Sequence, residues 1–139
     1  MAYFPWDLPL ETAESDPISR HFVSESFSAA DQEDGTTYYY IDMDGFRYFS
    51  IQVDDTPGVA GDQTYTIEAT NQDDGTAAAS CSYDDVTNAW LGVASFATDF
   101  YATRDTPVAC KYIRIKVVRA NDGEGNEDGA WDIYVKKLY

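Results

Sequence analysis

The chain of 139 residues has a length typical of one domain, and its 25 acidic and nine basic residues give a net charge of −16. This balance argues against nucleic acid and against an anionic membrane as partners, because both require clustered lysine and arginine. No apolar run approaches the length of a membrane helix, and residues 1–7 lack the features of a signal peptide, so we expect a protein made in a cytoplasm.

Residues 1–21 are predicted to form an extended arm that precedes a β domain at residues 22–139. Three prolines interrupt any regular element in the arm, and each restricts the residue before it to extended conformations. The side chains between the prolines are too apolar for a solvated tail. We therefore expect the arm to dock on its own domain or on a neighbouring subunit. The expected anchors are Tyr3, Phe4, Trp6 and Leu8.

From Phe22 onward the sequence predicts short strands separated by turn-forming residues. The first four predicted strands are 22–29, 36–42, 46–54 and 64–70. The Asp44-Gly45 pair after the second strand is a strong hairpin signal, so the second and third strands are expected to pair. Apolar and polar residues alternate in the third and fourth strands, which predicts one buried and one solvated face.

The second half of the chain is predicted to add a weak strand at 76–83, an irregular aromatic stretch at 90–101, and two clear strands at 109–120 and 130–138. The last two strands are expected to form a long hairpin around a Gly/Asp loop. Residues of equal parity along the strands should share one interior. These residues are Phe49, Ile51, Val53, Tyr65, Ile67, Ile113, Ile115, Val117, Ile133 and Val135.

About eight short strands at regular spacing predict an all-β fold, an antiparallel β-sandwich of jelly-roll type. A closed barrel is the main alternative. No stretch has sustained helical periodicity, and no internal repeat stands out.

The sequence contains few residues of the types and spacings that catalytic sites require. His21 is the single histidine, and it lies where the arm meets the domain, without a nucleophile beside it. Cys81 and Cys110 are expected to be free thiols, with one disulfide as the alternative. Paired carboxylates leave glycoside hydrolysis open, but most acids fall in turns, where aspartate bonds to backbone amides. We expect no enzyme and no cofactor.

One loop near the C-terminus has oxygen ligands at alternate positions, as at the start of an EF-hand loop. Glu127 stands where that loop has its glycine, and Ile133 stands where it has its final glutamate. A solvated hairpin tip is therefore the expectation, with calcium binding as the alternative. The calcium ligands would be Asp122, Glu124, Asn126 and Asp128.

Basic residues gather in the C-terminal part of the chain, among them Arg114, Lys116 and Lys136. A domain whose surface is acidic except for one basic edge could bind copies of itself through opposite charges, so these three residues are candidate interface residues. A surface that is simply kept soluble by repulsion is the alternative.

Several segments resemble small structural β-sandwich proteins of tailed-phage virions. YTIEATNQDDG at 65–75, followed by DVT at 85–87 and by Trp90, is similar to the strand, turn and aromatic pattern of those proteins. KYIRIKV at 111–117 and AWDIYVKK at 130–137 fit the same pattern. Discoidin-like (galactose-binding-like) domains have a weaker similarity at the corresponding strands.

The phage resemblance implies a capsid decoration or cement protein, which binds the outer surface of a capsid and stabilises it. It implies a homo-oligomer, with a trimer favoured, whose partners are the major capsid protein or other virion proteins and whose location is the virion. The alternative is a carbohydrate- or receptor-binding module of a phage tail fibre. A third possibility is a small acid-catalysed glycan enzyme.

Overall fold

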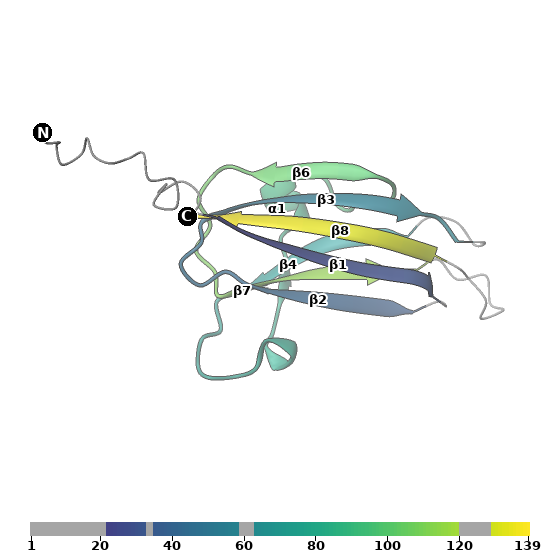
Figure 1. Ribbon diagram of the computed structural model, residues 1–139. Coiled ribbons are helices and arrows are strands. Elements are labelled where there is room, and N and C mark those ends of the chain that lie inside the picture. Colours follow the sequence, from purple (N-terminus) through teal and green to yellow (C-terminus); the bar gives the residue numbers. More distant parts are fainter. Residues whose placement is uncertain (1–21, 33–34, 59–62, 120–128) are drawn as a thin grey trace, which may run out of the picture.

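The computed structural model describes residues 22–32, 35–58, 63–119 and 129–139, which form two antiparallel sheets packed face to face (Figure 1). Sheet A contains, in spatial order, β1 (Phe22–Gln32), β8 (Gly129–Leu138), β3 (Tyr48–Thr56) and β6 (Phe100–Arg104). Sheet B contains β2 (Thr36–Asp42), β7 (Tyr112–Val118), β4 (Thr64–Thr70) and β5 (Asp84–Asp85). This order, in which most successive strands change sheet, is a jelly roll, so the predicted sandwich is confirmed and the barrel is not formed.

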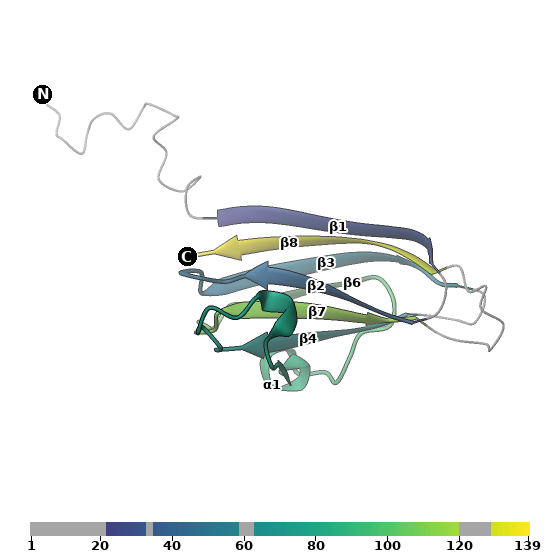
Figure 2. The same ribbon diagram turned by 90° about the horizontal axis from the view of Figure 1, so that it is seen from below.

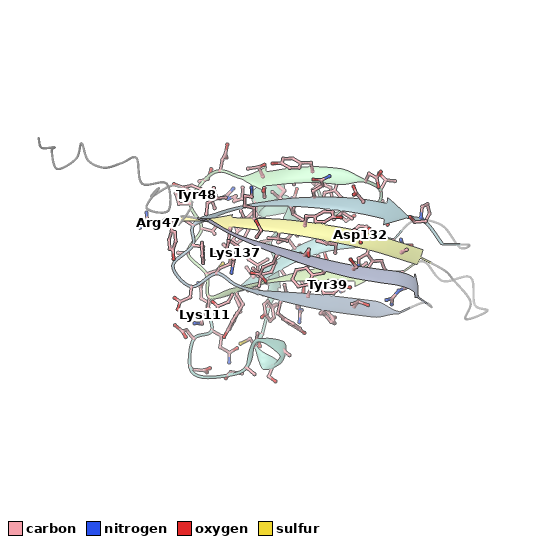
Figure 3. The ribbon with its side chains drawn as sticks, viewed as in Figure 1. Tyr39, Arg47, Tyr48, Lys111, Asp132 and Lys137 are labelled. Carbon is pink, nitrogen blue, oxygen red and sulfur yellow. The ribbon has the colours of Figure 1, made fainter. Side chains whose placement is uncertain are left out.

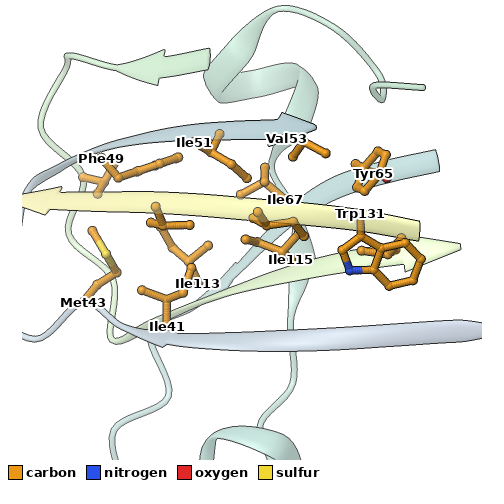
Figure 4. Packing of buried hydrophobic residues seen from close by; sticks show 14 residues of the cluster. Ile41, Met43, Phe49, Ile51, Val53, Tyr65, Ile67, Ile113, Ile115 and Trp131 are labelled. Atoms are coloured by element: carbon orange, nitrogen blue, oxygen red, sulfur yellow. The ribbon is translucent and has the colours of Figure 1, made fainter. Parts of the chain in front are cut away.

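All ten side chains predicted for the interior are buried between the sheets (Figure 4). Strand alternation directs them inward from both layers, where they form one continuous cluster. Burying each large side chain contributes roughly 1.5–3 kcal/mol, so this cluster is the main source of stability. The cluster also includes four buried residues beyond the predicted set, namely Ile41, Met43, Val108 and Trp131.

Two predicted hairpins are wrong. β7 pairs with β2 and β4, whereas β8 pairs with β1 and β3, so the last two long strands face each other across the interior. Likewise β2 and β3 lie in different sheets, and the turn at Asp44-Gly45 crosses between the layers. Gly45 has a φ of 85°, and the Asp42 carboxylate accepts the Asp44 N–H at 2.9 Å, which makes the turn tight.

The predicted weak strand at 76–83 is also wrong, because this part of the chain contains the 3₁₀ turn η4 (Ala78–Ser80). None of the η4 side chains is buried, so there is little apolar area to hold the segment in a sheet. Figure 1 shows η4 outside the two sheets, on the side of β2, which it contacts. The Tyr83 hydroxyl donates to the Ala78 carbonyl at 2.9 Å and closes the loop on itself.

A short helix, α1 (Thr87–Leu91), lies beside β4 (Figure 2). The Thr87 hydroxyl is fully buried, where it accepts the Ile67 N–H at 2.8 Å and donates to the Asp85 carboxylate at 2.7 Å. The helix ends at Gly92, whose φ of 80° suits glycine. Neither helical segment of the described residues has the length or apolar character of a membrane span.

Candidate functional site

The outer face of sheet A carries an ordered row of side chains. In an antiparallel sheet, residues in register on neighbouring strands lie side by side on one face. Ser26 on β1 is in register with Tyr134 on β8, Tyr134 with Gln52 on β3, and Gln52 with Tyr101 on β6. The row therefore places one tyrosine ring on each side of the Gln52 amide.

A second row, toward the beginning of β1, consists of hydroxyls and one amine. Lys136 is in register with both Ser24 and Ser50, and Ser50 is in register with Thr103. This row adds hydrogen-bonding groups of several kinds next to the tyrosines.

A third row, on the other side of the tyrosines, is acidic. Asp132 is in register with Asp54 and with Ser28, whose hydroxyl donates to Asp132 Oδ1 at 2.6 Å. Two carboxylates directly opposite each other destabilise a sheet, so this pair has a cost in stability. Figure 3 shows Asp132 far from Arg47, Lys111 and Lys137, which lie toward the end of the sandwich that holds the C-terminus.

The first two rows, apart from Thr103, line a shallow hollow of about 450 Å³ together with Glu25 and Val135. Tyr101 is 68% exposed and Tyr134 is 46% exposed, so both rings present apolar area to solvent. An aromatic ring offers a flat face to a ligand, and the neighbouring hydroxyl and amide groups supply directional hydrogen bonds. We refer to Ser24, Ser26, Ser50, Gln52, Tyr101, Tyr134 and Lys136 as the tyrosine face.

Four aspartates are among the residues that line a neighbouring hollow of about 370 Å³, and the carboxylates of Asp55, Asp99 and Asp132 accept hydrogen bonds from groups of the chain itself. Asp55 accepts hydrogen bonds from Gln63 Nε2, at 2.7 Å, and from the Tyr65 hydroxyl, while its own N–H donates to Asp99 Oδ1 at 2.6 Å. Burial and the Asp55 carboxylate raise the pKa of Tyr65 well above its usual range. Over the four described ranges, no cluster of acidic, cysteine or histidine side chains is placed to hold a metal ion.

On the outer face of sheet B, Arg114 is engaged within the chain. Its guanidinium lies 4.3 Å from the ring centres of both Tyr38 and Tyr83, and its Nε donates to Glu68 Oε1 at 2.6 Å. These contacts attach the loop that carries Tyr83 to the sheet. Lys116 is in register with Tyr38 on the same face.

The predicted basic interface residues are therefore divided between two opposite faces. Arg114 and Lys116 belong to the outer face of sheet B, whereas Lys136 belongs to the tyrosine face. Lys137 points inward, where its Nζ lies 2.8 Å from Glu25 Oε2. The sandwich thus separates residues that the sequence suggested as one basic edge, and their contact with a partner stays a prediction.

Other predicted site residues lie outside the described residues. They are the arm anchors Tyr3, Phe4, Trp6 and Leu8, the junction residue His21, and the calcium candidates Asp122, Glu124, Asn126 and Asp128. Both cysteines are described and both are free thiols, as expected.

Sequence reasoning did not identify Tyr101 and Tyr134 as a pair. The alternation in 130–138 predicts that Tyr134 points outward, and an outward aromatic residue is a usable signal for a binding surface. No comparable signal exists for Tyr101, because the stretch 90–101 is irregular.

No family model matches the sequence, and no curated protein sequence matches it. Among solved structures, the Yersinia pseudotuberculosis-derived mitogen is similar, with a TM-score of 0.53 and 9% identity over 84% of this chain and 86% of that chain. The SPBc2 prophage-derived protein YomS has a TM-score of 0.40 and 12% identity over 82% and 95% of the two chains. Aeromonas hydrophila PliG, a periplasmic lysozyme inhibitor of g-type lysozyme, has a TM-score of 0.38 and 10% identity over 86% and 87%. At such identities the likeness to the mitogen supports the sandwich fold alone.

Proposed function

We propose that the chain is a structural protein of a tailed-phage particle, a decoration or cement protein that binds the outer capsid surface and stabilises it. The observation that carries this proposal is the position of β1. Its first residue, Phe22, is in register with Leu138 at one end of the sandwich. The segment 1–21, whose first ten residues are mostly apolar, is joined to the domain at that point, beside the C-terminus. An arm attached at one corner can hold a neighbour while both broad faces remain accessible.

The edge of β1 supports attachment at the same place. Among the described strands, β1 pairs with β8 alone, so its other edge has backbone groups available to a further strand. Lysine and proline are common blocks to pairing on solvated edge strands, and β1 has neither. Its register irregularity lies between Ala29 and Gln32, at the end away from Phe22. The Glu25 carboxylate of this strand is paired with Lys137. A strand from a neighbouring subunit could add to this edge through main-chain hydrogen bonds.

The proposed assembly is a homotrimer whose partners are the major capsid protein or other virion proteins, with the virion as its location. The function requires no catalytic residue and no cofactor. The variant His21→Ala is accordingly expected to bind particles as well as the unmodified protein does.

The test compares co-sedimentation of the full-length protein and of the double variant Phe4→Ala/Trp6→Ala with particles of the phage that encodes it. Burying one large apolar side chain is worth roughly 1.5–3 kcal/mol, so loss of both anchors should weaken binding at least about tenfold. The matched control is Glu11→Gln/Ser15→Ala, which alters polar residues of the same segment. Sedimentation velocity of the free protein gives its oligomeric state. Equal particle binding by the anchor variant and the control would contradict the proposal.

A further inference from the structure

Tyr134 and Tyr101 are set at a spacing that suits a ligand with a repeating structure. They lie on β8 and β6, the two strands that flank β3, and both are in register with Gln52. Neighbouring strands are about 4.8 Å apart, so the two tyrosine positions are separated by roughly 10 Å across the sheet. Because the sheet fixes both backbones, the positions from which the two rings project are set before any ligand arrives.

We propose that the tyrosine face binds a neutral polysaccharide that lies across the strands of sheet A. Two sugar rings of the chain stack their C–H faces on Tyr134 and Tyr101, since the electron-rich face of an aromatic ring attracts weakly positive hydrogens. The intervening sugar lies over Gln52, whose amide both donates and accepts hydrogen bonds. Ser50 and Thr103 supply hydroxyls at the side of the row.

The chemistry of the face favours a glycan over a protein partner. Gln52 stands between the two rings, and Ser26 and Ser50 lie beside them, so the outward neighbours of the rings in this row are polar rather than aliphatic. The centres of protein interfaces are apolar and depleted in serine and lysine, whereas four of the seven residues of the tyrosine face are serine or lysine. A sugar chain, by contrast, presents many hydroxyls and needs a donor or acceptor near each ring. Tyrosine also provides contact area with little loss of side-chain freedom.

The charged residues around the tyrosine face favour a neutral glycan over an anionic one. Asp132 and Asp54 form the acidic row on one side of the tyrosines, and Lys136 stands on the other side. The face thus has no group of cations that would hold carboxylated or phosphorylated sugars. The net charge of −16 further repels anionic chains at long range.

This inference goes beyond the proposed attachment to a capsid, because it concerns a broad face rather than the edge of β1. The two functions are compatible: a particle-bound subunit would present the tyrosine face outward to cell-surface sugars. Each of the two proposals can also be contradicted without the other, since glycan binding and particle binding are measured separately.

The test uses the full-length protein on an array of neutral oligosaccharides built from glucose, galactose, mannose, rhamnose and N-acetylglucosamine, with hyaluronate and alginate as anionic probes. Isothermal titration calorimetry then gives the affinity for each neutral oligosaccharide that binds. The variants are Tyr101→Ala, Tyr134→Ala and Gln52→Ala. The matched control is Tyr38→Ala, which removes a 38% exposed tyrosine from the outer face of the other sheet. Thermal unfolding verifies that every variant is folded.

We expect binding to at least one neutral oligosaccharide and a loss of roughly tenfold in affinity, about 1.4 kcal/mol, for each tyrosine variant. Tyr38→Ala should bind as the unmodified protein does, and all variants should retain particle association. Binding to no neutral glycan, binding to the anionic probes alone, or affinities of Tyr101→Ala and Tyr134→Ala equal to that of the unmodified protein would overturn the inference. So would a loss of capsid binding in these two variants without any glycan binding, because the face would then be a protein interface.

Discussion

The Trp131 indole N–H donates a hydrogen bond of 2.9 Å to the Tyr39 hydroxyl, which joins the two sheets through the interior. Trp131 belongs to β8 and is 2% exposed, while Tyr39 belongs to β2 in the facing layer. The ring of Phe27 stacks on Tyr39 with centres 4.7 Å apart and covers this contact from the edge of sheet A. The indole therefore obtains from Tyr39 the acceptor that a buried donor requires.

The variant Tyr39→Phe should lower the free energy of unfolding by about 1–3 kcal/mol, because it leaves a buried indole N–H without its acceptor while keeping the aromatic ring. Urea unfolding monitored by tryptophan fluorescence measures the change. Tyr134→Phe is the control, since it removes a hydroxyl from a ring that is 46% exposed. A loss in Tyr39→Phe no larger than in the control would contradict this account.

Ile115 lies at the centre of β7, is 1% exposed, and belongs to the interior predicted from the sequence. Replacing it with alanine should cost about 2–5 kcal/mol, because the substitution removes buried methyl groups and leaves a cavity. Val118→Ala, at a 36% exposed position of the same strand, should change stability by less than about 0.5 kcal/mol. Chemical denaturation of both variants measures their free energies of unfolding. Similar losses of stability at the two positions would contradict the inward position of Ile115 on β7.

Lys137 is a buried cation with three contacts inside the sandwich. Its Nζ lies 2.8 Å from Glu25 Oε2, donates to the Asp42 carbonyl at 2.7 Å, and lies 4.7 Å from the centre of the Phe46 ring. Lys137→Met should cost about 1–3 kcal/mol, since it leaves the Asp42 carbonyl and the partly exposed Glu25 carboxylate without their partner.

The double variant Glu25→Gln/Lys137→Met should recover part of that loss, because it removes the uncompensated charge. Lys136→Met, at the adjacent outward position, is the control and should have little effect. Free energies of unfolding for the four proteins form the test. A double variant less stable than Lys137→Met would show that the ion pair is not the source of the cost.

Burial raises the pKa of the Cys110 thiol to about 11. An unfolded thiol titrates near pH 8.5, so between these values the folded chain retains a proton that the unfolded chain loses. This contribution to stability is complete below the unfolded pKa and declines as the pH rises toward the folded one. Burial also raises the pKa of Tyr83 to about 12, but tyrosine titration begins to matter only above about pH 10.

Unfolding free energies of the unmodified protein should therefore fall more steeply between about pH 8 and pH 10 than those of Cys110→Ala. Urea denaturation at several pH values in this window provides the comparison. Identical slopes for the two proteins would show that the thiol is as accessible to water in the folded state as in the unfolded state.

Strand bounds and the direction of side chains, which depend on residues close together in the chain, were predicted well from the sequence. The strands β2 and β4 have the predicted bounds, and the parity of Phe49, Ile51 and Val53 was right because alternate residues of a strand point to opposite faces. The segment around η4 was misassigned because its alanines and serines are compatible with a strand but bury nothing there.

Strand partners, in contrast, were decided by the tertiary structure. Asp44-Gly45 makes a tight turn in either a hairpin or a crossing between layers, and the turn by itself does not distinguish them. In this jelly roll, most successive strands alternate between sheets, so β7 and β8 share the interior rather than hydrogen bonds. The same long-range pairing brings Tyr101 and Tyr134 to either side of Gln52. Local alternation determines which way each side chain points, but only the packing of two apolar faces against each other determines which strands become neighbours.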